Sequence, residues 1–258
     1  MDEDALIIQR LIDDWAIWRD CGDWERFRTV FHDDGLMMAT WRQGTADEFI
    51  QASRQGWARG VNILHFHGGK SVEISGSRAV AQTKMTISQR GMVEGVLCDV
   101  VCTGRFYDFF EKRSGKWGLV LRQPIYEKDR LDPVEPGRTV KLDQGLLGQF
   151  PEGYRHLAYL QTKIGYEVKK DMPGLRGTEV EALYAKGKSW LSGEPIDSAS
   201  LERLGRGERA CMLLAICADC ATTRANMPPV TSASSRIRRT MAVSVSTSLE
   251  RLAEDRQP

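Results

Sequence analysis

The chain has 258 residues, enough for one domain of ordinary size with an extension, or for two small domains. Its hydrophobic content of 41%, charged content of 28% and net charge of +1 are those of a soluble globular protein with no field that favours nucleic acid or an anionic membrane. It lacks an apolar run of about 18 residues, and its acidic start is unlike a signal peptide. We therefore expect a cytoplasmic protein without nucleic-acid or membrane partners, whose six scattered cysteines are reduced.

The N-terminal segment has the periodicity of helices. Apolar side chains at spacings of three and four predict a first helix over residues 3–18. Gly22 is expected to end this helix as a C-cap glycine. Asp23 is then expected to cap a second, short helix that reaches Phe31.

A turn, a strand and a third helix are expected next. Residues 32–35 have the composition of a turn, and residues 36–41 have that of a strand. Thr45 and Glu48 have the spacing of a capping box, in which each side chain bonds to the other residue's backbone N–H. The third helix should therefore start here and end near Gly60.

Strand periodicity dominates the next part of the chain. Four segments have it, at residues 61–74, 79–89, 93–112 and 116–126, with turns expected at residues 75–77, 90–91 and 113–115. The third segment is long for one strand, so we expect a bend or bulge within it. Helices segregated from a long antiparallel sheet predict an α+β layer fold. A strongly bent sheet with helices over one side leaves a conical cavity, a usual place for a small ligand.

The rest of the chain is expected to be an extension and a tail. Residues 129–138 read as a linker, and helical patterns follow at residues 149–171 and 178–190, which should pack on the barrel or on a neighbouring subunit. In the tail only residues 209–221 have the composition of an ordered segment. We divide the chain into a barrel, a helical extension, and a poorly ordered or variable tail, at residues 1–130, 131–192 and 193–258.

Two motifs stand out in this framework. The run from Trp18 to Arg28 contains Asp20, and the run Leu64-His65-Phe66-His67-Gly68-Gly69 contains His65. With the Gly-x-Trp turn at residues 115–117, their order resembles the scytalone dehydratase and SnoaL-like branch of the nuclear-transport-factor-2-like (NTF2-like) superfamily. The resemblance covers about residues 4–127, and hexachlorocyclohexane dehydrochlorinases and bacterial bile-acid dehydratases share the arrangement. The C-terminal half has no counterpart in the compact members.

The resemblance implies a cone-shaped α+β barrel, with three N-terminal helices packed on a curved antiparallel sheet and an Asp–His pair inside. Asp20 matches the family's aspartate and His65 its histidine. Scytalone dehydratase has a tyrosine where this chain has Arg19. A second catalytic histidine, expected near residues 89–90, and a water-polarising tyrosine, expected near residues 39–41, are also missing. These departures argue against scytalone itself as the substrate.

One acid and one imidazole are the minimum equipment for removing a proton from carbon without a cofactor. We expect a cofactor-independent lyase, in which Asp20 orients His65 and His65 is the acid/base of a dehydratase-like elimination from a small hydroxylated aromatic or alicyclic compound. A carbon–carbon lyase that releases formaldehyde from a lignin-derived diaryl diol, an isomerase and a non-catalytic ligand-binding barrel remain alternatives. In the plainest alternative, Asp20 only caps a turn and His65 is a core histidine.

Three further residues are candidates for substrate binding. Trp41 could fill the place of the missing tyrosine, and His67 shares a strand face with His65. Arg122 could hold a substrate oxygen, although we slightly favour a surface position for it and also place Arg19 at the surface. The four histidines lack a typical metal-ligand spacing, so we expect no metal site; His65 and His67 together with a carboxylate are the alternative, in which His67 contacts a metal. The resemblance implies a homo-oligomer, a trimer or alternatively a dimer.

Overall fold

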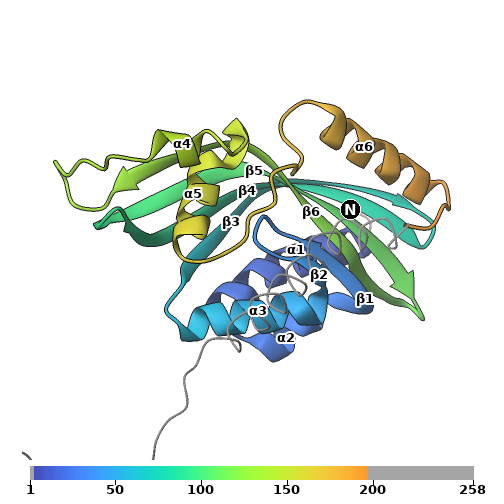
Figure 1. The fold of residues 1–258 in the computed structure, drawn as a ribbon. Coiled ribbons are helices and arrows are strands. Elements are labelled where there is room, and N and C mark those ends of the chain that lie inside the picture. Colours follow the sequence, from blue (N-terminus) through green and yellow to red (C-terminus); the bar gives the residue numbers. More distant parts are fainter. Residues whose placement is uncertain (1–2, 197–258) are drawn as a thin grey trace, which may run out of the picture. The chain divides into compact units, whose positions relative to one another are not determined.

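A computed structural model describes residues 3–196, which are organised around a six-stranded sheet of strand order β2-β1-β6-β5-β4-β3 (Figure 1). The strands are β1 (Phe31–Met38), β2 (Gln43–Thr45), β3 (Asn62–Ser75), β4 (Arg78–Val93), β5 (Val96–Arg113) and β6 (Lys116–Pro133). The helices are α1 (Glu3–Cys21), α2 (Trp24–Arg28), α3 (Ala46–Ala58), α4 (Gln144–Leu147), the 3-10 turn η1 (Glu152–Tyr154), α5 (Arg155–Lys163) and α6 (Thr178–Leu191). The ordered segment expected at residues 209–221 lies outside the described residues.

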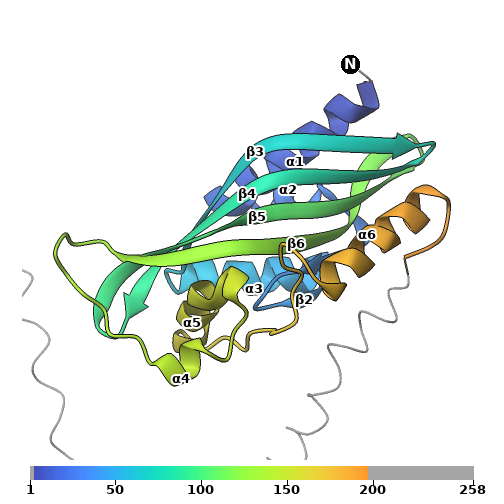
Figure 2. The same cartoon turned by 90° about the horizontal axis from the view of Figure 1, so that it is seen from above.

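The three N-terminal helices pack on one face of the sheet. Helix α1 contacts β3 and β6, and α3 contacts β1. Strands β3 to β6 run antiparallel and side by side over most of their length (Figure 2). Strand β1, however, lies parallel to β6, so the sheet is mixed. Parallel neighbours need a long crossover, and the chain from α3 to β5 supplies it. Among residues 3–196 no helix is both long and apolar enough to cross a membrane.

Local capping chemistry formed as expected. Gly22 follows α1 with φ of 76°, a conformation that suits glycine. The Asp23 side chain accepts the Arg26 N–H at the start of α2. Thr45 and Glu48 form the predicted capping box at the start of α3. The predictions of these three helix termini are therefore confirmed. They could be made from the sequence because each terminus depends on residues only a few positions apart.

The turn predicted at residues 32–35 is wrong. Helix α2 already ends at Arg28, and these residues belong to β1, in which a register shift lies between Phe31 and Leu36. The segment is therefore an irregular strand rather than a turn. Its acidic and glycine residues gave it the composition of a turn, but neighbouring strands hold it in the sheet.

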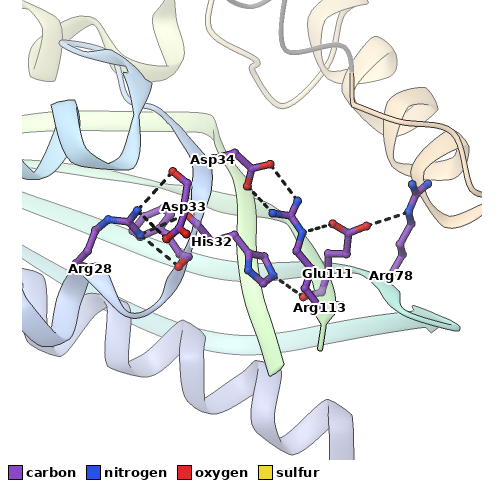
Figure 3. A network of polar contacts seen from close by, with 8 residues as sticks. Arg28, His32, Asp33, Asp34, Arg78, Glu111 and Arg113 are labelled. Atoms are coloured by element: carbon purple, nitrogen blue, oxygen red, sulfur yellow. Dashed lines mark hydrogen bonds and ion pairs between the residues drawn. The ribbon is translucent and has the colours of Figure 1, made fainter. Parts of the chain in front are cut away.

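A network of polar contacts connects this irregular part of β1 to its neighbours (Figure 3). Arg113, at the end of β5, donates two hydrogen bonds to the Asp34 carboxylate, at 2.7 and 3.1 Å, and one to Glu111 at 2.6 Å. A His32 ring nitrogen lies 2.8 Å from the Glu111 carbonyl oxygen. Arg28 donates to the carbonyl oxygens of Phe31 and His32. The Arg28 contacts are local, whereas the Asp34–Arg113 and His32–Glu111 contacts join β1 to the β5–β6 hairpin across about eighty residues of sequence.

The turn predicted at residues 90–91 is also wrong, because β4 continues to Val93. The hairpin turns instead at Glu94 and Gly95, whose φ values of 48° and 78° are those of a two-residue hairpin loop. Gly91 pairs with Cys98 within the ladder. A Cβ atom there would lie 2.9 Å from a Leu160 methyl carbon, so this glycine permits close approach of α5. The predicted turn at residues 113–115 is confirmed, and the bulges expected in the third long strand occur in β5 near Gly104 and Phe110.

The C-terminal extension packs on the same barrel. Strand β6 runs to Pro133, so the linker begins after this residue and not at residue 129 as predicted. The single helix expected over residues 149–171 is replaced by η1 and α5, and Pro151 and Gly165 lie at the breaks. Helix α5 contacts β4, β5 and β6, whereas α6 packs against Tyr107 and Phe109 on the other face of the sheet (Figure 1). The domain boundaries and the homo-oligomer stay predictions.

Candidate functional site

Asp20 and His65 meet inside the barrel. Asp20 lies in the last turn of α1, and His65 lies near the start of β3. One Asp20 carboxylate oxygen is 2.8 Å from His65 Nδ1, and the other accepts the backbone N–H of His65. Their side chains are only 12% and 8% exposed. Because both carboxylate oxygens are used, the imidazole ring is held in one orientation with Nε2 directed away from the aspartate.

The environment favours an ionised Asp20 beside a neutral His65. Burial raises the pKa of Asp20, but the hydrogen bond and charge of His65 and the charge of Arg19 outweigh it, so the net shift is downward. Burial lowers the pKa of His65, and the Arg19 and Arg122 charges add to this, against the opposing effect of Asp20. At neutral pH the Nδ1–H therefore donates to Asp20, and the Nε2 lone pair is free to accept a proton.

His65 lines a cavity enclosed by the sheet, α1, α3 and α5. We call it the inner hollow; it is bounded by Trp15, Arg19, Met37, Ala39, Thr40, Trp41, Phe49, Ile63, His65, Ile87, Phe106, Pro124, Tyr126, Leu157 and Gln161. Most of this wall is apolar. About 30 Å³ is open to the centre of a water-sized sphere, so a ring-sized ligand requires lining side chains to move aside.

A second hollow adjoins the first and shares part of its wall. We call it the outer hollow; it is bounded by Arg19, Trp24, Trp41, Ser53, Gly56, Trp57, Val61, Ile63, Gln89, Gln161 and Tyr166. Arg19, Trp41, Ile63 and Gln161 line both spaces. Trp41, which the sequence marks as a candidate, thus stands between them and packs on Tyr166 with ring centroids 5.1 Å apart.

The hollows are also lined by three polar residues that the sequence did not mark, one of them from the C-terminal extension. The Thr40 hydroxyl donates to the Gln161 side-chain oxygen at 2.7 Å, and the Gln161 side-chain nitrogen donates to Gln89 at 3.3 Å. All three residues are buried. The burial of Gln89 could be read from the sequence, because Gln89 lies on the same face of β4 as the buried residues Met85 and Ile87. The burial of Gln161 could not, since its position depends on where α5 docks.

The surface position expected for Arg19 is wrong. Arg19 is 5% exposed, and its guanidinium lies 3.2 Å from Asp20. The sequence does contain the signal: Arg19 continues the spacing of Ile8, Ile12 and Trp15 along the inward face of α1. Charge alone suggested the surface, but the helical period places this side chain in the interior.

The surface position slightly favoured for Arg122 is wrong as well. Arg122 is fully buried and donates two hydrogen bonds to Asp108, its partner across β5 and β6, at 2.8 and 2.7 Å. Its guanidinium carbon lies 4.3 Å from the ring centroids of both Trp15 and Phe106. Arg122 does not line either hollow in the described part of the chain, because these two rings stand between it and that space.

His67 also points into the barrel without lining either hollow. It packs near Trp15 and Phe106, at centroid distances of 6.3 and 5.4 Å, and neither ring nitrogen has a hydrogen-bond partner. Burial, followed by the charges of Arg122 and His65, lowers its pKa to about 2, against a weaker opposing contact with the Ile12 backbone. Within residues 3–196 no group of three or more His, Cys, Asp and Glu side chains could hold a metal ion.

Comparisons with known proteins agree with this architecture. Residues 3–123 match the family model described as a SnoaL-like domain. Pea pathogenicity protein 2 of Fusarium vanettenii is 39% identical over 205 residues, which cover 75% of this chain and 88% of that protein. An uncharacterised protein of Emericella nidulans is 38% identical over 216 residues, covering 75% of this chain and 90% of that protein. Since 75% of the chain exceeds the SnoaL-like match, these relatives share part of the extension.

Similar solved structures match this chain at low identity and with low TM-scores. A putative scytalone dehydratase from Novosphingobium aromaticivorans DSM 12444 is 17% identical, with a TM-score of 0.43 over 53% of this chain and 95% of that chain. A hexachlorocyclohexane dehydrochlorinase from Novosphingobium barchaimii LL02 is also 17% identical, with a TM-score of 0.43 over 54% and 95%. The cone-shaped α+β fold predicted from the sequence is confirmed. The chain belongs to the SnoaL-like family of the NTF2-like superfamily.

Proposed function

We propose that the protein is a cofactor-independent lyase that eliminates water from a small hydroxylated aromatic or alicyclic compound. The observation that carries this proposal is the 2.8 Å contact between Asp20 and His65 Nδ1, with the imidazole at the wall of the inner hollow. A base needs an unprotonated nitrogen that faces the substrate, and this arrangement supplies one. The lowered pKa values of both groups keep the pair as carboxylate and neutral imidazole.

The proposed reaction conserves protons. His65 Nε2 removes a proton from a carbon next to the one that bears the hydroxyl group. The electron pair of that C–H bond forms the new C=C bond, and the C–O bond breaks. The imidazolium, which the Asp20 carboxylate stabilises, returns its proton to the departing oxygen, so water leaves and the catalyst is regenerated.

The test compares two histidine variants in a screen of hydroxylated aromatic and alicyclic compounds by mass spectrometry. In H65A we expect turnover to fall by about 10²–10⁴-fold with the fold retained, because the general base is lost. H156A is a matched control, since His156 Nδ1 also lies 2.8 Å from an aspartate, Asp129, but His156 does not line either hollow. D20N should lose activity like H65A, because an amide cannot hold the imidazole as a carboxylate does.

The products distinguish the alternatives. Loss of water from the substrate supports dehydration, and release of formaldehyde supports carbon–carbon cleavage. A product of unchanged mass supports isomerisation. If the parent protein binds compounds but converts none of them, the lyase proposal is wrong and a binding function replaces it. If the parent is active and H65A and H156A retain equal activity, the assignment of His65 as the base is wrong.

A further inference from the structure

The outer hollow contains buried polar groups whose hydrogen-bonding capacity is unused. Arg19 directs Nη1 to Asp20 at 3.2 Å and, more weakly, to the Ile63 carbonyl oxygen at 3.5 Å, but its Nε is buried without an acceptor. The hydroxyl of Ser53, a residue only 4% exposed on α3, is buried without a partner too. Unpaired buried donors are costly, so a ligand oxygen that accepts from them is favoured.

The charge that lines the two hollows is positive only. Among the described residues that line the two hollows, Arg19 is the only charged one, and no aspartate or glutamate faces either space. Asp20 forms an ion pair with Arg19, but it lines neither hollow and is already hydrogen-bonded to His65. In a largely dry site, an exposed edge of a guanidinium attracts an anion more strongly than it does in water.

The size of the outer hollow limits what can enter it. About 10 Å³ is open to the centre of a water-sized sphere, which corresponds to roughly one oxygen atom. Gln89 and Gln161 add polar groups to its lining, and Arg19, Trp41 and Ile63 line both this space and the inner hollow. A group seated beside Arg19 can therefore belong to a molecule whose remainder occupies the inner hollow beside His65.

We infer that Arg19 and Ser53 form a binding subsite for an ionised carboxylate of the substrate. One carboxylate oxygen accepts hydrogen bonds from Arg19 Nε and the Ser53 hydroxyl in the outer hollow, and the carbon skeleton extends toward His65. This inference deepens the proposed function, on which it depends for the presence of substrate in the cavity: the substrate is a hydroxylated carboxylic acid rather than a neutral compound.

The test is binding of small probes, measured by titration calorimetry without any turnover. The probes form two matched pairs, acetate with acetamide and benzoate with benzamide, which differ mainly in charge. For the parent protein we expect at least one carboxylate to bind about tenfold or more tightly than its amide, as a charge-assisted hydrogen bond supplies. R19Q should abolish this preference, and S53A should reduce it about threefold or more because one donor is lost.

R10Q is the matched control, because Arg10 lies on the same helix with its side chain 84% exposed. It removes the same charge and should keep the preference. S53A keeps the inference testable if R19Q does not fold. Equal binding within both pairs, absence of binding by all four probes, or an unchanged preference in R19Q or S53A would overturn the carboxylate subsite. Such a result would leave elimination from neutral substrates untouched, whereas loss of the lyase activity in the compound screen would leave the probe preference intact.

Discussion

Arg122 and Asp108 form a fully buried, doubly hydrogen-bonded ion pair in the middle of the sheet, with distances of 2.8 and 2.7 Å. Burial raises the pKa of Asp108, against the opposing charge and hydrogen bonds of Arg122. One guanidinium nitrogen of Arg122, Nη1, has no partner. The Arg122 guanidinium packs against Trp15 and Phe106, two aromatic residues that line the inner hollow. Because the pair is buried, each of its two charges is compensated mainly by the other.

The first prediction concerns this pair. D108N should reduce the free energy of unfolding by about 3–5 kcal/mol, because it leaves the Arg122 charge buried and uncompensated. The double variant D108L/R122M should recover most of this loss, since two apolar side chains of similar volume need no pairing. Urea unfolding of the parent and both variants measures the difference. If D108N is as stable as the parent, the ion pair is not a structural requirement.

The second prediction concerns the pH dependence of the proposed activity. In the proposed mechanism the base form of His65 is the active one. Its pKa lies below the ordinary 6.5, so kcat/KM should rise with pH and the midpoint of this rise should lie below that value. Arg19 is one of the charges that lower this pKa, so residual activity in R19Q should reach its plateau at a higher pH. Initial rates across the acidic range measure both profiles. An activity that is lost as the pH rises through neutrality would contradict a neutral imidazole base.

The third prediction concerns acid stability and His67. The unfolded chain binds a proton at His67 below about pH 6.5, whereas the folded protein resists it until about pH 2. Stability should therefore fall as the pH decreases through this window, by at most about 1.4 kcal/mol per pH unit from this residue. H67M should remove that contribution, because methionine does not titrate and packs well against aromatic rings. Urea unfolding at several pH values tests this, and parallel curves for parent and H67M would contradict it.

The fourth prediction compares two glycines. A Cβ atom on Gly104 would lie 2.0 Å from the Ile125 carbonyl oxygen, a backbone atom that cannot move independently of β6. A Cβ atom on Gly69 would meet nothing within 4 Å. We expect G104A to lower the free energy of unfolding by about 1–3 kcal/mol or more and G69A to change it by about 0.5 kcal/mol or less. Equal stability of the two variants would show that β5 and β6 separate readily at this bulge.

The sequence predicted what depends on neighbouring residues. Asp23, Thr45 and Glu48 cap helices within one turn, and Gly22 takes a left-handed conformation that glycine adopts without a steric penalty. Strand alternation directs His65 into the barrel, and the resemblance of its motif to a known family paired it with Asp20. The helical spacing along α1 also indicated that Arg19 is buried, although its charge suggested a surface position.

The tertiary structure decided what depends on distant partners. Gly91 is a contact for Leu160 rather than a turn, because α5 docks on β4. Asp34 belongs to a strand because Arg113, 79 residues away, pairs with it. Gln161 reaches the cavity only because the extension folds back over the barrel. Capping and alternation act through bonds between near neighbours and can be read from the chain, whereas cavity shape and charge compensation arise from contacts between segments that only folding brings together.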